Sequence, residues 1–165
     1  MRRLSILSLV AVLSLVGLIA GPASAKGATT STFTIAQPIQ WNESPGTLNP
    51  HGGIRDAVYR GIILSSDGRV AGNITWIVNV SPTKPGGVWD WQAQMWGTFH
   101  IENAQGSWEG SWRGSRGPGA EGVHIIDAVG RGAGAYEGLH IKFHMQGVSI
   151  LDWVGTGEIL DPGHH

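Results

Sequence analysis

The sequence predicts an all-β protein in which about eight antiparallel strands close into an up-and-down barrel. Segments of roughly 6 to 12 residues alternate between apolar and polar side chains, and short turns rich in glycine and proline separate them, with no convincing helical pattern. Glycines on the apolar faces (Gly72, Gly97 and Gly110) favour a barrel over the alternative, a β-sandwich, because strands bend sharply where no side chain obstructs them.

Residues 1–25 have the three parts of a cleaved secretory signal peptide. Arg2 and Arg3 form the positive start, residues 4–20 are an uncharged apolar stretch, and residues 23–25 (Ala-Ser-Ala) match a cleavage site. The alternative is an uncleaved anchor, since 17 apolar or small residues are near the lower limit for crossing a bilayer. The cleavage motif favours removal, so we expect a secreted protein, extracellular or periplasmic, with no stable membrane insertion.

Removal of 25 of the 165 residues leaves 140, which suits a single domain. Without Arg2 and Arg3 the chain has 9 basic and 12 acidic residues, a net charge of −3 without charged blocks, so no nucleic-acid partner is expected. The mature part keeps 24 of the 26 glycines and all 8 tryptophans, which indicates a folded, β-rich chain. There is no cysteine, and no motif predicts a cofactor.

The mature chain is predicted to consist of a flexible leader over residues 26–32, one barrel domain over residues 33–160 and a loose tail over residues 161–165. The first strand is predicted over residues 32–41 and is interrupted at Pro38, because proline has no N–H for a strand ladder.

The segment over residues 54–64 is ambiguous, since its apolar residues also fit a helical stripe. A hairpin is the economical interpretation, because Asp67-Gly68 is a turn signal and residues 69–80 then alternate between apolar and polar side chains. Further strand-like segments follow over residues 88–103, 106–114, 123–129, 139–147 and 148–160.

A glycine-rich stretch over residues 129–139 matches, at Gly130, Gly132 and Ala135, the fingerprint of a loop that binds dinucleotide phosphates. Such a loop opens a helix, whose N-terminal N–H groups bind the phosphates. Residues 139–146 instead alternate strictly between apolar and polar side chains. We therefore predict a strand after the glycines, and a turn rather than a phosphate site.

The same glycines, in GRGAGAYEGL over residues 130–139, resemble the G-T-G-x-Y/F-x-G signature of the allene oxide cyclase and dirigent barrel superfamily, which includes many uncharacterised bacterial members. The strand, turn and glycine–tryptophan strand over residues 96–114 are also similar in order. The resemblance implies a β-turn whose aromatic residue, here Tyr136, packs on the barrel. The sequence departs from the signature at Ala133, where Thr is usual. It does not match the family's catalytic residues, so the resemblance does not extend to cyclase activity.

Three histidines are candidate metal ligands. His140 and His144 lie about 13 Å apart if both are on one strand, which is too far for one zinc ion to join them. If Gly130 opposes Gly138 in the hairpin, His124 opposes His144 on the polar face. We expect solvated surface histidines and no metal site.

In that register Asp127 falls on the apolar side of its strand, between Ile125 and Val129. Either a bulge shifts the phase of the strand, which we favour, or a carboxylate enters the barrel end. In the second case Asp127, near Arg131 and Tyr136, is the nearest approach to a tuned acid or base.

The candidate ligand site is the aromatic interior of the barrel. The expected ligand-binding residues are Trp76, Trp91, Trp108, Trp112, Phe143, Asp127 and Tyr136. An eight-stranded barrel is either packed solid by such side chains or holds one small ligand, and both alternatives stay open. Trp89 and Trp96 are expected to look outward or toward a rim, where an aromatic ring can stack on a sugar.

The sequence thus predicts a secreted barrel that is a non-catalytic binding or structural protein, with a small apolar molecule as its candidate partner. One alternative is an isomerase-like or cyclase-like enzyme, which would need an ionisable pair in the cavity. The other is a carbohydrate-binding module, which would need a coplanar row of exposed tryptophans.

Overall fold

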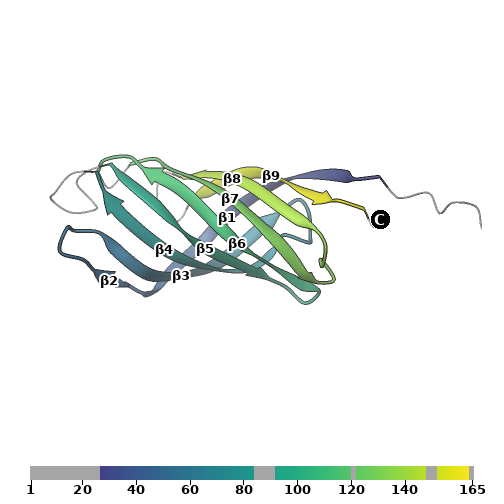
Figure 1. Cartoon of the computed structure of the whole chain (residues 1–165), viewed down its shortest axis with the longest axis horizontal. Coiled ribbons are helices and arrows are strands. Elements are labelled where there is room, and N and C mark those ends of the chain that lie inside the picture. Colours follow the sequence, from purple (N-terminus) through teal and green to yellow (C-terminus); the bar gives the residue numbers. More distant parts are fainter. Residues whose placement is uncertain (1–26, 84–91, 120–121, 148–151, 164–165) are drawn as a thin grey trace, which may run out of the picture.

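The computed structural model describes residues 27–83, 92–119, 122–147 and 152–163, so the predicted signal peptide lies outside the described residues. Eight strands close into an antiparallel barrel, which confirms the predicted fold class (Figure 1). These eight are the long strands β1 (Thr29–Ser44), β3 (Ile54–Ser65), β4 (Gly72–Pro82), β5 (Ala93–Glu102), β6 (Gly106–Arg116), β7 (His124–Gly134), β8 (His140–Gly147) and β9 (Trp153–Asp161), and the described residues add a two-residue strand, β2 (Thr47–Leu48). The described part contains no helix that is long and apolar enough to cross a membrane.

Strand β1 closes the barrel by pairing with both β9 and β3. Residues from Thr29 to Gln37 pair with β9, and residues from Ile35 to Ser44 pair with β3. The strands from β3 to β9 each pair with their neighbours in sequence, while the two-residue β2 lies beside β3. The 16 residues of β1 allow it to reach both partners, so each long strand has two neighbours.

The predicted interruption at Pro38 does not end the first strand. The register between β1 and β3 shifts between Ala36 and Ile39. A β-bulge at this point accommodates a residue that has no N–H to donate, so the strand continues to Ser44.

Both predicted boundaries of the domain are too narrow. Strand β1 begins at Thr29, inside the predicted leader of residues 26–32, and β9 ends at Asp161 rather than 160. The sequence TTST shows no apolar alternation, but Thr29 to Thr32 pair with the last residues of β9, and this hydrogen bonding makes them a strand.

The ambiguous segment over residues 54–64 is strand β3. It forms an antiparallel ladder with β4, in which Gly61 lies opposite Ile74 and Tyr59 opposite Trp76. The hairpin interpretation is therefore confirmed, and the helical stripe in this segment is coincidental.

Aromatic rings fill the middle of the barrel. The ring centroid of Trp76 lies 6.0 Å from Phe99, 5.7 Å from Trp112 and 6.4 Å from Phe143, in tilted and edge-to-face geometries that aromatic pairs favour. Gly110 makes room for this cluster, because a Cβ there would come within 2.7 Å of the Phe99 ring. The predicted use of glycine on an inward face thus has a direct packing reason.

The glycine-rich stretch is a turn between β7 and β8, as predicted, and a strand rather than a helix follows it. Gly134 and Gly138 have φ angles of 68° and 83°, which residues other than glycine rarely adopt. A Cβ at Gly132 would lie 2.1 Å from the carbonyl oxygen of Tyr136. The turn brings Tyr136 into the end of the barrel, where it is buried.

At this end, which we call the closed end, buried aromatic side chains stack on each other. The ring of Tyr136 stacks on Trp108 with 5.2 Å between centroids and 13° between planes. The Tyr136 hydroxyl donates to Oδ1 of Asn103 (2.8 Å), and Nε1 of Trp108 donates to the carbonyl oxygen of Arg69 (2.7 Å). Both buried polar groups of the stack are therefore satisfied.

The predicted register of the β7–β8 hairpin is wrong by three residues, because Gly130 lies opposite Ile141 rather than Gly138. Since side chains alternate along a strand, an odd shift exchanges the two faces of β7. His124 is consequently buried in the interior, and Asp127 faces outward with 65% of its side chain exposed. Neither the bulge nor the inward carboxylate occurs, since β7 pairs with both neighbours without a register shift.

Candidate functional site

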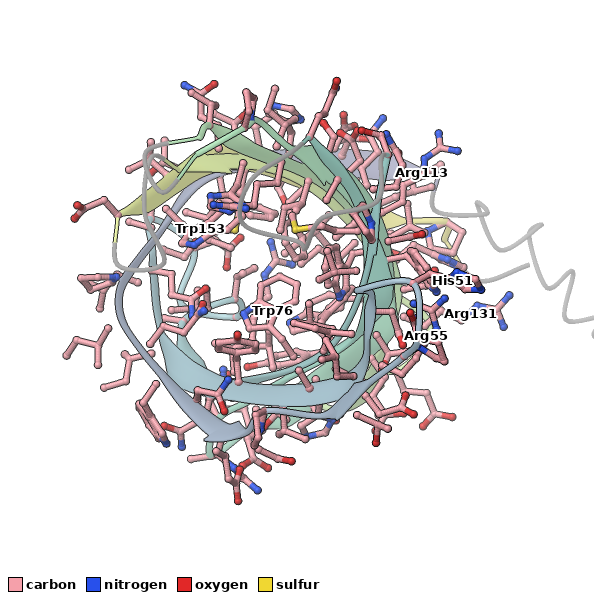
Figure 2. The ribbon with its side chains drawn as sticks, turned by 90° about the vertical axis from the view of Figure 1, so that its left-hand side faces the viewer. His51, Arg55, Trp76, Arg113, Arg131 and Trp153 are labelled. Atoms are coloured by element: carbon pink, nitrogen blue, oxygen red, sulfur yellow. The ribbon has the colours of Figure 1, made fainter. Side chains whose placement is uncertain are left out.

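The end of the barrel opposite the closed end contains a partly enclosed pocket, and we call this end the pocket end. Seen from there, Trp76 and Trp153 lie inside the barrel wall, whereas Arg113 and Arg131 point outward (Figure 2). The accessible volume of the pocket is about 80 Å³. One water molecule needs roughly 10–15 Å³ of such volume, so the pocket has room for several waters or for the apolar end of a small ligand.

The deep wall of the pocket is aromatic and apolar. Trp76 from β4 and Trp112 from β6 contact each other edge to face, with an interplanar angle of 86°, and Met95 and Ile126 complete this wall. Nε1 of Trp76 donates to Oε1 of Gln37 (3.1 Å), which fixes the orientation of the indole. The rigid rings offer a flat surface against which an apolar group can pack.

Polar side chains form a layer above this wall, toward the mouth of the pocket. Gln37, Arg116 and His124 are the buried polar or charged residues of the described part, and all three line the pocket together with Trp153. Strand pairing explains why they meet. Arg116, His124, Gly147, Trp153 and Gln37 are successive register partners across β6, β7, β8, β9 and β1. We call Gln37, Arg116, His124 and Trp153 the polar collar.

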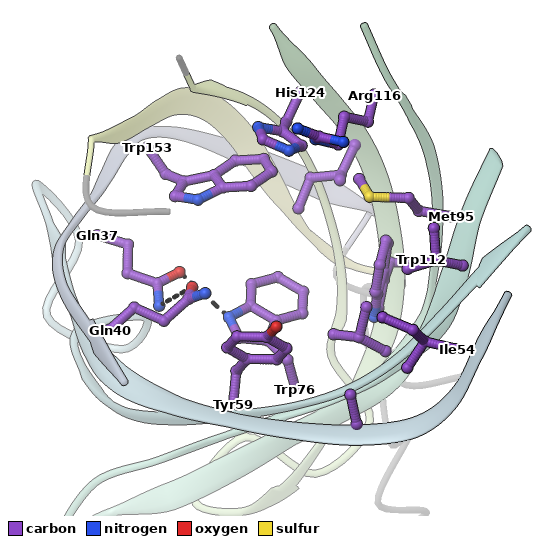
Figure 3. Close-up of a pocket in the computed structure, with 14 residues that line it drawn as sticks. Gln37, Gln40, Ile54, Tyr59, Trp76, Met95, Trp112, Arg116, His124 and Trp153 are labelled. Atoms are coloured by element: carbon purple, nitrogen blue, oxygen red, sulfur yellow. Dashed lines mark hydrogen bonds between the residues drawn. The ribbon is translucent and has the colours of Figure 1, made fainter. Parts of the chain in front are cut away.

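Gly147 occupies the position in this row between His124 and Trp153. Because glycine has no side chain, the rings of His124 and Trp153 approach each other across the intervening strand, with 5.5 Å between centroids and 35° between planes. Figure 3 shows the two rings along one wall of the pocket, with Arg116 beside His124 and with Trp76 and Tyr59 across the space.

The hydrogen bonds of the collar divide it into a satisfied and an unsatisfied part. Gln37 accepts from Trp76 and donates Nε2 to Oε1 of Gln40 (2.8 Å), and Nη2 of Arg116 donates to the carbonyl oxygen of Gly119. Among the described residues, Nδ1 of His124 and Nε1 of Trp153 have no partner although both are buried. A buried polar atom without a partner costs about 1–3 kcal/mol, so this geometry favours an additional hydrogen-bonding group.

The protonation of the collar follows from its burial. Burial lowers the pKa of His124 below its ordinary value of 6.5, and the positive charge of Arg116 acts in the same direction, while a hydrogen bond with the backbone of Gly147 opposes them. Burial also lowers the pKa of Arg116, whose guanidinium nevertheless stays charged in proteins. At neutral pH the collar therefore holds one positive charge next to a neutral imidazole.

The structure separates the predicted ligand-binding residues. Trp76 and Trp112 line the pocket, whereas Trp108 and Tyr136 belong to the closed end. Phe143 packs on Trp76 and Phe99 in the middle of the barrel. Asp127 is on the outer surface, and Trp91, like Trp89, lies outside the described residues.

Asp127 makes its contact outside the barrel. Its Oδ1 lies 2.9 Å from Nδ1 of His144, and both side chains are about half exposed or more. His140, on the same face of β8, is exposed as well. The described residues contain no group of three or more His, Asp or Glu side chains that could hold a metal ion.

Sequence reasoning missed four members of the site: Gln37, Arg116, His124 and Trp153. For two of them, the alternation of side chains along the strand indicates that they face the interior. Gln37 continues the inward series of Phe33 and Ile35, and Arg116 continues the series of Trp108 and Trp112 by four residues. His124 had no such signal, because both faces of its strand carry apolar residues.

Two described tryptophans are exposed, Trp41 on β1 and Trp96 on β5. They belong to strands that do not pair with each other, and the guanidinium of Arg55 lies over the Trp96 ring at 4.7 Å. This pair does not form the coplanar row that a sugar-binding face needs.

No protein-family model matches the chain, and no curated protein is significantly similar to it.

Proposed function

We propose that the chain is a binding protein that holds a small apolar molecule in the pocket at the pocket end of the barrel. One observation carries the proposal. At the closed end the aromatic rings fill the interior, whereas at the pocket end Trp76 and Trp112 border a space of about 80 Å³. Concave, mostly apolar sites with a few polar groups are the usual form of small-molecule sites.

We also propose that the protein is secreted and that it is related to the allene oxide cyclase and dirigent barrels. The predicted signal peptide supports the first. The β-turn that carries Tyr136 onto Trp108 supports the second, since the resemblance implies an aromatic residue packed on the barrel at this turn.

The test is to fill the pocket. We expect hexanol and benzyl alcohol, two neutral probes, to bind the full chain in calorimetric titrations. Val78→Phe places a larger side chain in the pocket wall and should weaken binding by at least about tenfold, or ~1.4 kcal/mol. Val154→Phe, the same exchange on the exposed face of β9, is the matched control and should leave affinity unchanged. Absence of binding, or equal losses in both variants, would contradict the proposal.

An enzyme is the second candidate, because the collar provides an ionisable pair inside the barrel, Arg116 and His124. A neutral buried histidine is a suitable general base. The two functions differ in the fate of the ligand. A binding protein returns its ligand chemically unchanged after long incubation, as NMR would show, whereas conversion that is lost in His124→Gln would favour the enzyme.

A further inference from the structure

Nε1 of Trp153 and Nδ1 of His124 are buried at the pocket and have no hydrogen-bond partner among the described residues. The two nitrogens differ in chemistry. Nε1 of Trp153 is always a donor. Nδ1 of His124 is the second nitrogen, and in a neutral imidazole it is a donor or an acceptor according to the tautomer. Figure 3 shows the indole nitrogen of Trp153 on the side of the pocket. A group that satisfies both nitrogens must accept from Trp153 and also interact with Nδ1 of His124.

The charge around these nitrogens favours an anion. The guanidinium of Arg116 is buried next to His124 and influences it electrostatically. The side-chain amides of Gln37 and Gln40, which also line the pocket, are hydrogen-bonded to each other. No acidic side chain is among the described residues that line the pocket.

We propose that the pocket selects small apolar monocarboxylates, with the carboxylate between Trp153, His124 and Arg116 and the apolar end against Trp76 and Trp112. This inference rests on the proposed function, and names its ligand class. A carboxylate has two oxygens, so one can accept from Trp153 while the other meets Nδ1 of His124. The apolar wall lies on the inner side of the collar, which sets the orientation of the ligand.

Binding should then take up a proton. When the proton of neutral His124 is on Nε2, Nδ1 carries a lone pair, which repels a carboxylate. A proton on Nδ1 turns it into a donor and produces a charge-assisted hydrogen bond. The described groups that face His124 are Arg116 from β6, the Gly147 backbone from β8, and the uncharged Trp153 and Gln37 from β9 and β1. None of them can supply this proton at neutral pH, so it comes from solvent.

The experiment compares matched acids and alcohols on the full chain at neutral pH. Hexanoate should bind about ten- to a hundredfold more tightly than hexanol, and benzoate more tightly than benzyl alcohol, because a hydrogen bond to a charged group is worth about 1.5–3 kcal/mol. Calorimetry in two buffers of different ionisation enthalpy should show the uptake of about one proton with each acid and none with the alcohols.

Variants assign the effect to the collar. Trp153→Phe keeps an aromatic side chain, although a smaller one, and removes the donor, so acid affinity should fall about tenfold while hexanol affinity changes much less. His124→Gln should abolish the proton uptake. Trp108→Phe at the closed end is the control and should alter neither affinity.

The outcomes separate the two proposals. If hexanol binds and hexanoate binds no more tightly, acid selection is wrong and the apolar pocket stands. If the preference for hexanoate survives Trp153→Phe and proton uptake survives His124→Gln, the collar is not the carboxylate site. If no probe binds, the proposed function and this inference both fail.

Discussion

The two ends of the barrel use the same kind of residue for different purposes. At the closed end Trp108 lies flat on Tyr136, and every polar atom of that pair has a partner within the protein. At the pocket end Trp153 lies beside His124, and both rings keep one buried nitrogen without a partner in the described part. Aromatic content alone therefore does not distinguish the closed end from the pocket end.

What distinguishes the ends is the completeness of their hydrogen bonding. Buried polar groups in folded proteins are nearly always paired, so an end where they are paired needs nothing further. Unpaired buried groups that face a pocket do not stabilise the fold, and they are available for hydrogen bonds with a ligand. This contrast leads to predictions about stability at both ends, beginning with the largest expected effect.

Trp108→Ala should break the closed end. Trp108 has no exposed surface, and a cavity of this size costs about 3–5 kcal/mol in the free energy of unfolding. Trp112→Ala should cost less, since Trp112 already borders the pocket and part of its packing is absent. Urea denaturation of both variants measures the difference, and a larger loss for Trp112→Ala would contradict the contrast between the ends.

Gly132→Ala tests the turn that delivers Tyr136 to the closed end. Because the new Cβ would meet the Tyr136 carbonyl oxygen at 2.1 Å, we expect a loss of about 1–3 kcal/mol in thermal or urea unfolding. Gly68→Ala is the matched control, since a Cβ there meets nothing within 4 Å, and it should be nearly neutral. Equal effects of both changes would show that the close approach at Gly132 is relaxed in solution.

The pocket end should show the smallest effect, as a pH dependence. The lowered pKa of His124 means that the unfolded chain binds a proton there at higher pH than the folded chain. Stability rises with pH wherever the unfolded state binds more protons, so His124 should reduce stability as the pH falls below about 6.5.

Free energies of unfolding at pH 7.5 and 5.5 measure this effect. His124→Gln should lessen the loss between these two pH values, while His140→Gln, an exchange at an exposed position of β8, should not. A loss that is the same in His124→Gln as in the unchanged protein would show that His124 is not the group responsible.

The strands were predictable because each one carries its own alternation. Trp108, Gly110 and Trp112 identify one face of β6 without any knowledge of its neighbours. The same local signal could not place the ends of β1, since Thr29 to Thr32 become a strand only through pairing with β9. Local pattern therefore predicts the existence of strands better than their limits.

The site was less predictable because it depends on register. His124 and Asp127 exchange faces when the β7–β8 hairpin shifts by three residues, and the length of the glycine-rich turn decides that shift. Which tryptophans share an end was accessible in principle. Trp108 lies two residues after the first residue of β6, near a hairpin turn, while Trp112 lies four residues further along the strand.

The pairing of Thr29 with Asp161 provides a site at which the molecule can be attached to something else. Both residues lie at the end of the barrel that Trp108 and Tyr136 close, as the side-by-side ends of β1 and β9 show (Figure 1). A carrier protein, a dye or a solid support attached at Thr29 or at Asp161 would hold the protein at this end. The mouth of the pocket would then point away from the attachment, so immobilised chains should present it to the surrounding solution.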